Sequence, residues 1–147
     1  MTTNESPSLP SSTRIYSNEE NSTLPTNDTD LTSTFSQSDY NAVAADDSNN
    51  VFQTSTNNYN IFLFKKKHTE KNSIFLTIRL KSDRAPFYSP VYLQIYNKNS
   101  STWETLNNNH TEKANVNFTL TGTVISNSSN YFDNNYWISY RIYQESI

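Results

Sequence analysis

The sequence predicts an all-β protein, a two-sheet antiparallel β-sandwich of jelly-roll type. Apolar and polar residues alternate along several segments, which is typical of strands that bury one side. Aromatic residues form 14% of the chain, and its 10 Tyr and 8 Phe are suited to packing on a pleated surface. About eight such segments, separated by polar turns, favour a sandwich. The jelly-roll order is inferred from the number of strands alone.

The clearest strand covers residues 91–97, where apolar and polar side chains alternate strictly. Its aliphatic residues are predicted to face a core, and its tyrosine and glutamine residues to face the other way. A polar turn at 98–101 leads into a second strand at 102–106, which contains the large apolar residue Trp103. These segments predict a β-hairpin with one aliphatic face and one aromatic-polar face.

Residues 1–30 differ in composition from residues 31–147, which we expect to form one sandwich domain. The first segment consists largely of Ser, Thr, Asn and Pro and has few sizeable apolar side chains. Such a segment buries too little surface to offset the entropy that it loses on ordering. We therefore expect residues 1–30 to form an extended or disordered polar arm, which becomes ordered where a neighbouring subunit holds it.

The sandwich domain is expected to begin with short elements. A strand at 31–35 precedes a short helix that starts at Ser36 or Ser38, because serine side chains cap helix N-termini. Further strands are predicted at 51–54, 59–64 and 73–81, the last with alternate aliphatic residues facing inward. The basic run Lys65-Lys66-Lys67-His68 is interpreted as the solvated tip of a hairpin.

Two more alternating strands are predicted towards the C-terminus, after an irregular loop at 82–90 and the central hairpin. The strand at 116–124 has an inward set of Val116, Phe118, Leu120 and Val124. Residues 128–133 predict a turn or a single helical turn. The closing strand at 136–143 places Ile138, Tyr140 and Ile142 on one face and Trp137, Ser139 and Arg141 on the other.

Composition and charge exclude several classes of function. The net charge of −3 and the lack of clustered positive charge argue against nucleic acid as a partner. The absence of cysteine excludes disulfides, thiolate metal sites and cysteine nucleophiles. The N-terminus lacks the basic and apolar regions of a signal peptide, and no apolar run approaches membrane-spanning length. We expect synthesis in the cytoplasm and no membrane insertion, with a place outside the cell as part of an assembled particle left open.

No set of residues indicates catalysis, and we expect a non-enzymatic protein without a cofactor. The acidic residues are scattered and both histidines fall in polar segments, so neither an acid–base pair nor a histidine metal site is predicted. Asp46 and Asp47 are weak candidates for a calcium site, because sandwich loops can supply carboxylate and carbonyl oxygens. An ordinary acidic turn is the simpler interpretation of this pair.

The candidate ligand or interface residues are aromatic residues near loops and strand ends, namely Phe87, Tyr88, Tyr131, Phe132 and Tyr136. Flat rings beside Asn and Asp side chains can stack on sugar faces while the polar groups bind hydroxyls. The same rings suit a protein interface, where tyrosine is enriched. A third interpretation is structural, with both tryptophans in the core and the tyrosines covering the sheet edges.

Five short segments share a pattern with a known kind of module. They are VYLQIYN at 91–97, WETL at 103–106, FTLTG at 118–122, YFD at 131–133 and WISYRIY at 137–143. Residues 31–147 thereby resemble a small β-sandwich module of predicted bacteriophage structural proteins and bacterial surface proteins. The resemblance implies a scaffold and transfers no active site to this chain.

Two functions of different classes follow. The first is a non-enzymatic structural or interaction subunit of a virion or surface assembly, of decoration, tail or appendage type. Its partners would be other protein subunits of the same or another kind, and its N-terminal arm would dock on them. The alternative is a carbohydrate-binding β-sandwich module that attaches to a glycan surface through its loop aromatic residues.

Overall fold

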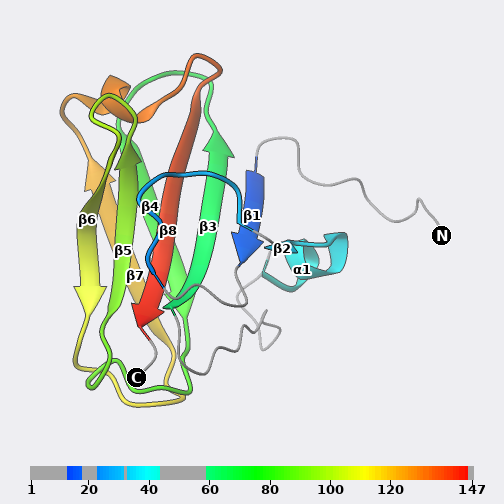
Figure 1. The fold of residues 1–147 in the computed structure, drawn as a ribbon, viewed down its shortest axis with the longest axis vertical. Coiled ribbons are helices and arrows are strands. Elements are labelled where there is room, and N and C mark those ends of the chain that lie inside the picture. The colour runs from blue at the N-terminus through cyan, green and yellow to red at the C-terminus, as the bar shows by residue number, and fades with distance from the viewer. Residues whose placement is uncertain (1–12, 18–22, 32, 44–58, 146–147) are drawn as a thin grey trace.

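The protein consists mainly of β-strands in two antiparallel sheets, as seen in a computed structural model that describes residues 13–17, 23–31, 33–43 and 59–145. The larger sheet has the order β2-β1-β3-β8-β5-β6 and the smaller one pairs β4 with β7 (Figure 1). The larger sheet contains β1 (Thr13–Ser17), β2 (Ser33–Thr34), β3 (Tyr59–Lys67), β5 (Val91–Asn97), β6 (Thr102–Asn109) and β8 (Trp137–Glu145). The smaller sheet contains β4 (Ile74–Leu80) and β7 (Phe118–Val124).

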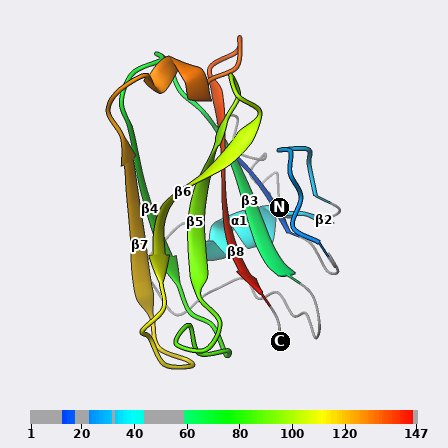
Figure 2. The same ribbon diagram turned by 60° about the vertical axis from the view of Figure 1, so that its left-hand side comes forward.

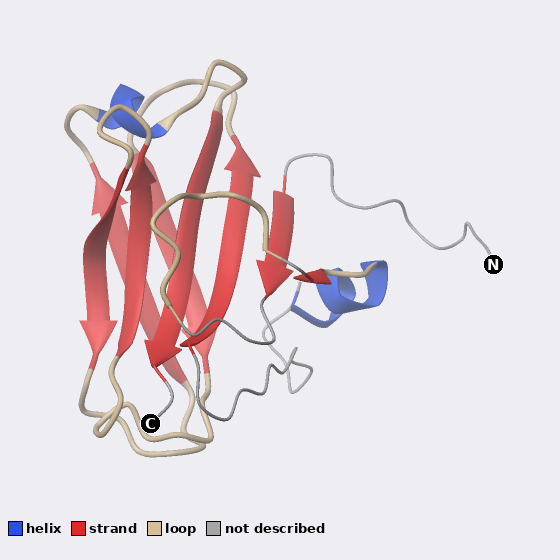
Figure 3. Cartoon of the chain, in the orientation of Figure 1, coloured by secondary structure: helices blue, strands red, loops and turns tan. Residues whose placement is uncertain are grey.

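The two sheets face each other as layers, which confirms the expected sandwich-like, all-β fold (Figure 2). Helical structure in the described residues is limited to α1 (Gln37–Val43) beside the larger sheet and the 3-10 helix η1 (Ser128–Tyr131) at one end (Figure 3). The predicted helical turn near residues 128–133 is thus confirmed.

The core lies between the sheets and is built from the alternating residues of their strands. It is formed by Ile74, Leu76, Val91, Leu93, Ile95, Phe118, Leu120, Val124, Phe132, Ile138, Tyr140 and Ile142. The inward sets predicted for the central hairpin and the closing strand are confirmed. Each fully buried Ile or Leu contributes about 1.5–3 kcal/mol through the apolar surface that it removes from water. The prediction for Val116 was wrong, because this residue precedes β7 and is exposed.

The predicted hairpin is present as β5 and β6, but β6 extends three residues beyond the expected end at 106. The pairing shifts between Leu93, which pairs with Asn107, and Gln94, which pairs with Thr105. Leu106 is therefore the extra residue of a β-bulge, and its side chain packs against the core.

The lysine run does not form a hairpin tip. Lys65, Lys66 and Lys67 continue β3 and pair with residues 137–139 of β8, which is long enough to supply partners for all three. The turn starts only at His68, whose N–H donates to the carbonyl of Tyr136 at 2.9 Å. Because β3 and β4 belong to different sheets, the link between them crosses from one layer to the other.

The helix α1 begins where the sequence indicates. The N–H of Asp39 donates to Oγ of Ser36 at 3.2 Å, and the N–H of Ser36 donates to Oδ2 of Asp39 at 2.9 Å. This reciprocal arrangement is a capping box and confirms Ser36 as the N-cap. The strand predicted at 31–35 is reduced to β2, and the strand predicted at 51–54 lies outside the described residues.

Two parts of the N-terminal 30 residues lie against the body of the same chain. Thr13–Ser17 is strand β1, which pairs with β3 over its whole length and with β2. Residues 23–31, which we name the strap, lie across the face of β5 and β8 that points away from the core, which we name the outer face (Figure 1). Both parts are extended and are held by their own chain: Ile15 of β1 is buried with Phe35 and Tyr40, and polar and backbone groups hold the strap.

Gly122, the single glycine of the chain, lies where the core leaves no room for a larger side chain. A Cβ atom at this position would lie 2.8 Å from Cδ1 and 2.9 Å from Cβ of Leu106, and 3.2 Å from Cδ2 of Leu93. We predict that Gly122→Ala lowers the free energy of unfolding by about 1–3 kcal/mol, because it overpacks this contact. Urea unfolding measures the loss, and Thr121→Ala, at an exposed neighbouring position, is the control. Equal stability of the two variants would contradict the prediction.

Candidate functional site: an aromatic loop and a strap-covered sheet face

The five aromatic residues singled out from the sequence are divided between opposite ends of the sandwich. Phe87 and Tyr88 lie in the loop of residues 82–90, which precedes β5 and which we name the aromatic loop. The other three lie in or after η1, beside the turn that follows β5. The structure therefore does not bring the five residues together into one site.

Of the three residues near η1, only Tyr136 presents a well-exposed ring. Phe132 is 5% exposed and belongs to the core, so its assignment to a surface site was wrong. Its ring closes one end of the core and contacts the His68 ring edge-to-face, with centroids 5.3 Å apart. Tyr131 donates its hydroxyl hydrogen to Oε1 of Glu104 at 2.5 Å, which raises the pKa of the phenol to about 12.

The aromatic loop presents two adjacent exposed rings. Phe87 is 62% exposed and Tyr88 is 74% exposed. Their centroids are 5.1 Å apart and the ring planes are perpendicular, so one edge points at the other face. The pair offers apolar ring surface and one phenolic hydroxyl to a ligand or partner.

The backbone beneath these two rings is held by hydrogen bonds. The N–H of Phe87 donates to the carbonyl of Glu112 at 3.1 Å, and the N–H groups of Tyr88 and Ser89 donate to the carbonyl of Ala85 at 3.0 and 3.1 Å. Pro86, within the loop, is fully buried. The rings are therefore exposed on a fixed backbone.

Gln144 of β8 ties the aromatic loop to the large sheet. Its buried side-chain amide donates to the carbonyls of Arg84 at 3.1 Å and Ser89 at 2.8 Å, and its Oε1 accepts from Oγ of Ser82 at 2.6 Å. Oγ of Ser89 also donates to the carbonyl of Glu145. Neither Ser89 nor Gln144 was recognised from the sequence, because a polar residue at a strand end gives no signal of the loop that it meets.

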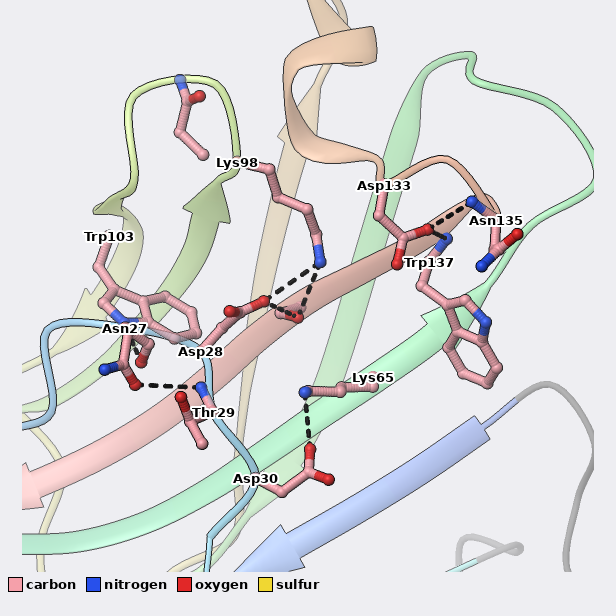
Figure 4. Close-up of polar contacts among 12 residues, drawn as sticks. Asn27, Asp28, Thr29, Asp30, Lys65, Lys98, Trp103, Asp133, Asn135 and Trp137 are labelled. Carbon is pink, nitrogen blue, oxygen red and sulfur yellow. Dashed lines mark hydrogen bonds and ion pairs between the residues drawn. The ribbon is translucent and has the colours of Figure 1, made fainter.

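The second candidate region is the outer face under the strap (Figure 4). Two body groups donate to strap carbonyls, Nη1 of Arg141 to Pro25 at 2.7 Å and Nε1 of Trp103 to Asn27 at 3.1 Å. Trp103 thus lies on the outer face rather than in the core. The N–H of Thr29 donates to Oδ1 of Asn27 at 3.1 Å, which forms an Asx turn within the strap.

Carboxylates of the strap meet lysines of the body. Oδ2 of Asp28 accepts from Oγ of Ser139 at 2.7 Å and from Nζ of Lys98 at 3.1 Å. Oδ1 of Asp30 lies 2.6 Å from Nζ of Lys65. Burial disfavours the charge of Asp28, but the Ser139 and Lys98 contacts outweigh it and lower the pKa of this carboxyl below its usual value.

Arg141 is the buried centre of the outer face. It is 3% exposed, its Nε donates to Oε1 of Gln94 at 2.9 Å, and its guanidinium lies 4.1 Å from the ring centroid of Trp103. Burial lowers the pKa of Arg141 to about 10. Its hydrogen bonds within the described residues go to neutral acceptors, so its charge is solvated by amide and carbonyl oxygens and by aromatic rings. The sequence predicted the correct face for Arg141 but not its burial.

Comparison with known proteins gives no assignment: no family model, curated protein or solved structure matches the chain. Among the described residues, no group of three or more His, Cys, Asp and Glu side chains is placed to hold a metal ion. Asp46 and Asp47 lie outside these residues. No helix in the described part of the chain is long and apolar enough to cross a membrane.

We predict that Gln144→Ala loosens the aromatic loop and lowers the free energy of unfolding by about 1–3 kcal/mol, since it removes the partner of two carbonyls and of the half-buried Ser82 hydroxyl. Amide hydrogen exchange at residues 87–89 should accelerate. Gln144→Glu keeps the size of the side chain but places an oxygen against those carbonyls, so it should be at least as damaging. Unchanged exchange in both variants would contradict the assigned role.

We also predict that Asp28 contributes about 1–2 kcal/mol at neutral pH through its charged hydrogen bonds. Because its pKa is lowered in the folded state, this contribution is complete above the unfolded-state pKa of about 4 and disappears as pH falls through the folded-state pKa. The stability difference between the natural chain and Asp28→Asn should therefore shrink below about pH 4. Denaturant unfolding at several pH values measures it, with the exposed Asp83→Asn as control. A difference independent of pH would refute the assignment.

Proposed function

We propose that this protein is a non-enzymatic structural or interaction subunit of a virion or surface assembly, of decoration, tail or appendage type. The observation that supports it best is the exposed pair Phe87 and Tyr88 on a loop whose backbone is fixed by hydrogen bonds. Aromatic residues dominate the binding energy of many interfaces. A loop whose backbone is already fixed loses little backbone conformational entropy when a partner covers it.

The remaining parts of the proposal concern architecture and location. We also propose that the body is of jelly-roll type. Its larger sheet has six strands and its smaller sheet has two. The resemblance of residues 31–147 to phage and bacterial surface modules supports a location in a virion or cell-surface assembly. The partners would be other protein subunits, and the N-terminal residues would contact neighbouring subunits in addition to their own body.

The test is the double variant Phe87→Ala/Tyr88→Ala. Both side chains are exposed, so the fold should persist while self-association or partner binding weakens by 10-fold or more, as expected when two interface aromatics contribute about 1.4 kcal/mol or more together. Analytical ultracentrifugation over a range of concentrations measures association. Phe75→Ala is the matched control, because Phe75 is 69% exposed on the smaller sheet. Equal association of both variants would refute the loop as the interface.

The alternative function is carbohydrate binding, in which the same loop attaches the protein to a glycan surface. The perpendicular ring pair favours it, since Tyr88 offers a ring face and a hydroxyl to a sugar. A glycan array with the natural chain and the double variant separates the two functions. Sugar binding that is lost in the double variant while association is unchanged would support the alternative, and the absence of any sugar binding would exclude it.

A further inference from the structure

The strap is part of the connection between two paired strands. Tyr16 of β1 pairs with Thr34 of β2, and Ser17 pairs with Ser33, so the chain between them leaves the sheet and returns at one place. β1 is independently joined to β3 along its length. The pairing of β1 and β2 in the larger sheet therefore does not depend on the strap contacts with the outer face.

The outer face holds the strap by contacts that any copy of the same segment could make. Body side chains donate to two backbone carbonyls, those of Pro25 and Asn27. Two carboxylates, those of Asp28 and Asp30, meet lysine ammonium groups. Such contacts require an extended acidic segment in the correct register, and they do not depend on which chain supplies it.

Charge on the outer face favours an acidic segment. Three cations lie there, namely Lys65, Lys98 and Arg141. The strap contributes two carboxylates, which form ion pairs with the two lysines. Arg141 is directed at the strap by its bond to the Pro25 carbonyl, although its own hydrogen bonds go only to neutral oxygens. A second copy of this chain carries a segment that is known to fit, because the structure contains that segment on that face.

We propose that the outer face accepts the strap of a second copy of this chain, so that two copies exchange straps. This inference rests on the proposed function, for which it names a second copy as the partner and adds a contact surface besides the aromatic loop. Exchange preserves each contact, so its free energy differs little from that of the closed single chain, and the local concentration of neighbours decides between them. Reciprocal exchange makes both halves of the interface identical, as in a twofold-symmetric pair. A dense assembly supplies the concentration that exchange needs.

The test uses the natural chain, prepared once with ordinary nitrogen and once with ¹⁵N, and mixed at concentrations at which it self-associates. A carbodiimide, which joins a carboxylate directly to an amine, should link Asp28 to Lys98 and Asp30 to Lys65, since these pairs lie 3.1 and 2.6 Å apart. Exchange produces linked peptides that combine one light and one heavy chain. Linked peptides of one isotope only, from associated protein, would overturn the proposal.

A pair of charge-reversed variants gives a second test that does not depend on cross-linking. In Asp28→Lys the strap repels Lys98, and in Lys98→Asp the face repels Asp28, so closure within one chain and pairing between identical variants are both weakened. In the mixture, each strap meets an opposite charge on the other variant. We expect a heterodimer by native mass spectrometry only after mixing, and its absence would count against exchange.

The outcomes separate this inference from the proposed function. Association that depends on Phe87 and Tyr88 but shows no mixed-isotope link would leave the subunit role intact and remove strap exchange. Mixed-isotope links in the Phe87→Ala/Tyr88→Ala variant would support exchange as an interface separate from the aromatic loop. A chain that stays monomeric at every concentration would remove strap exchange, and the subunit role would then require a partner of another kind.

Discussion

The central constraint on this structure is that β5 and β8 are buried on both faces, although only one face of each strand is aliphatic. Their aliphatic residues pack between the sheets, but Gln94, Ser139 and Arg141 point the other way and are also buried. Buried polar groups must find hydrogen-bond partners, or they cost more than they contribute. The strap and the neighbouring strands supply those partners, so a short polar segment becomes part of the folded body.

Much of the fold could be predicted because the inner face obeys a single rule, the burial of alternate apolar residues. The residues of β5, β7 and β8 that face the core, for example Leu93, Leu120 and Ile138, followed from their spacing. Val116 obeyed the same spacing but lies before β7, since periodicity does not mark where pairing starts. Lys65 to Lys67 were wrongly predicted to form a hairpin tip for a related reason. A run of charged residues predicts a turn, and only the length of the partner strand β8 shows that the strand continues through it.

The outer face and the candidate site were less accessible to prediction, because they depend on contacts between residues far apart in the chain. Asp28 accepts a hydrogen bond from Ser139, and Gln144 accepts one from Ser82. Single hydrogen bonds of this kind produce no periodic pattern in the sequence from which they could be predicted. Exposed aromatic residues could be proposed but not placed. Phe87 and Tyr88 proved exposed, whereas Phe132 belongs to the core, and the same residue type gives both results.

The arrangement of the two regions follows from β8, which serves both. Its Gln144 fixes the aromatic loop at one end of the sandwich, while its Arg141 and Ser139 hold the strap further along the same strand. A strand in the middle of a sheet is among the most rigid elements of a fold, because pairing on both edges and packing on both faces restrain it. The aromatic loop and the strap-covered outer face, both attached to this strand, are therefore held in a fixed geometry. A single strand of a body with an ordinary aliphatic core thus supports both an exposed aromatic loop and a polar face that the strap covers, without a separate domain for either.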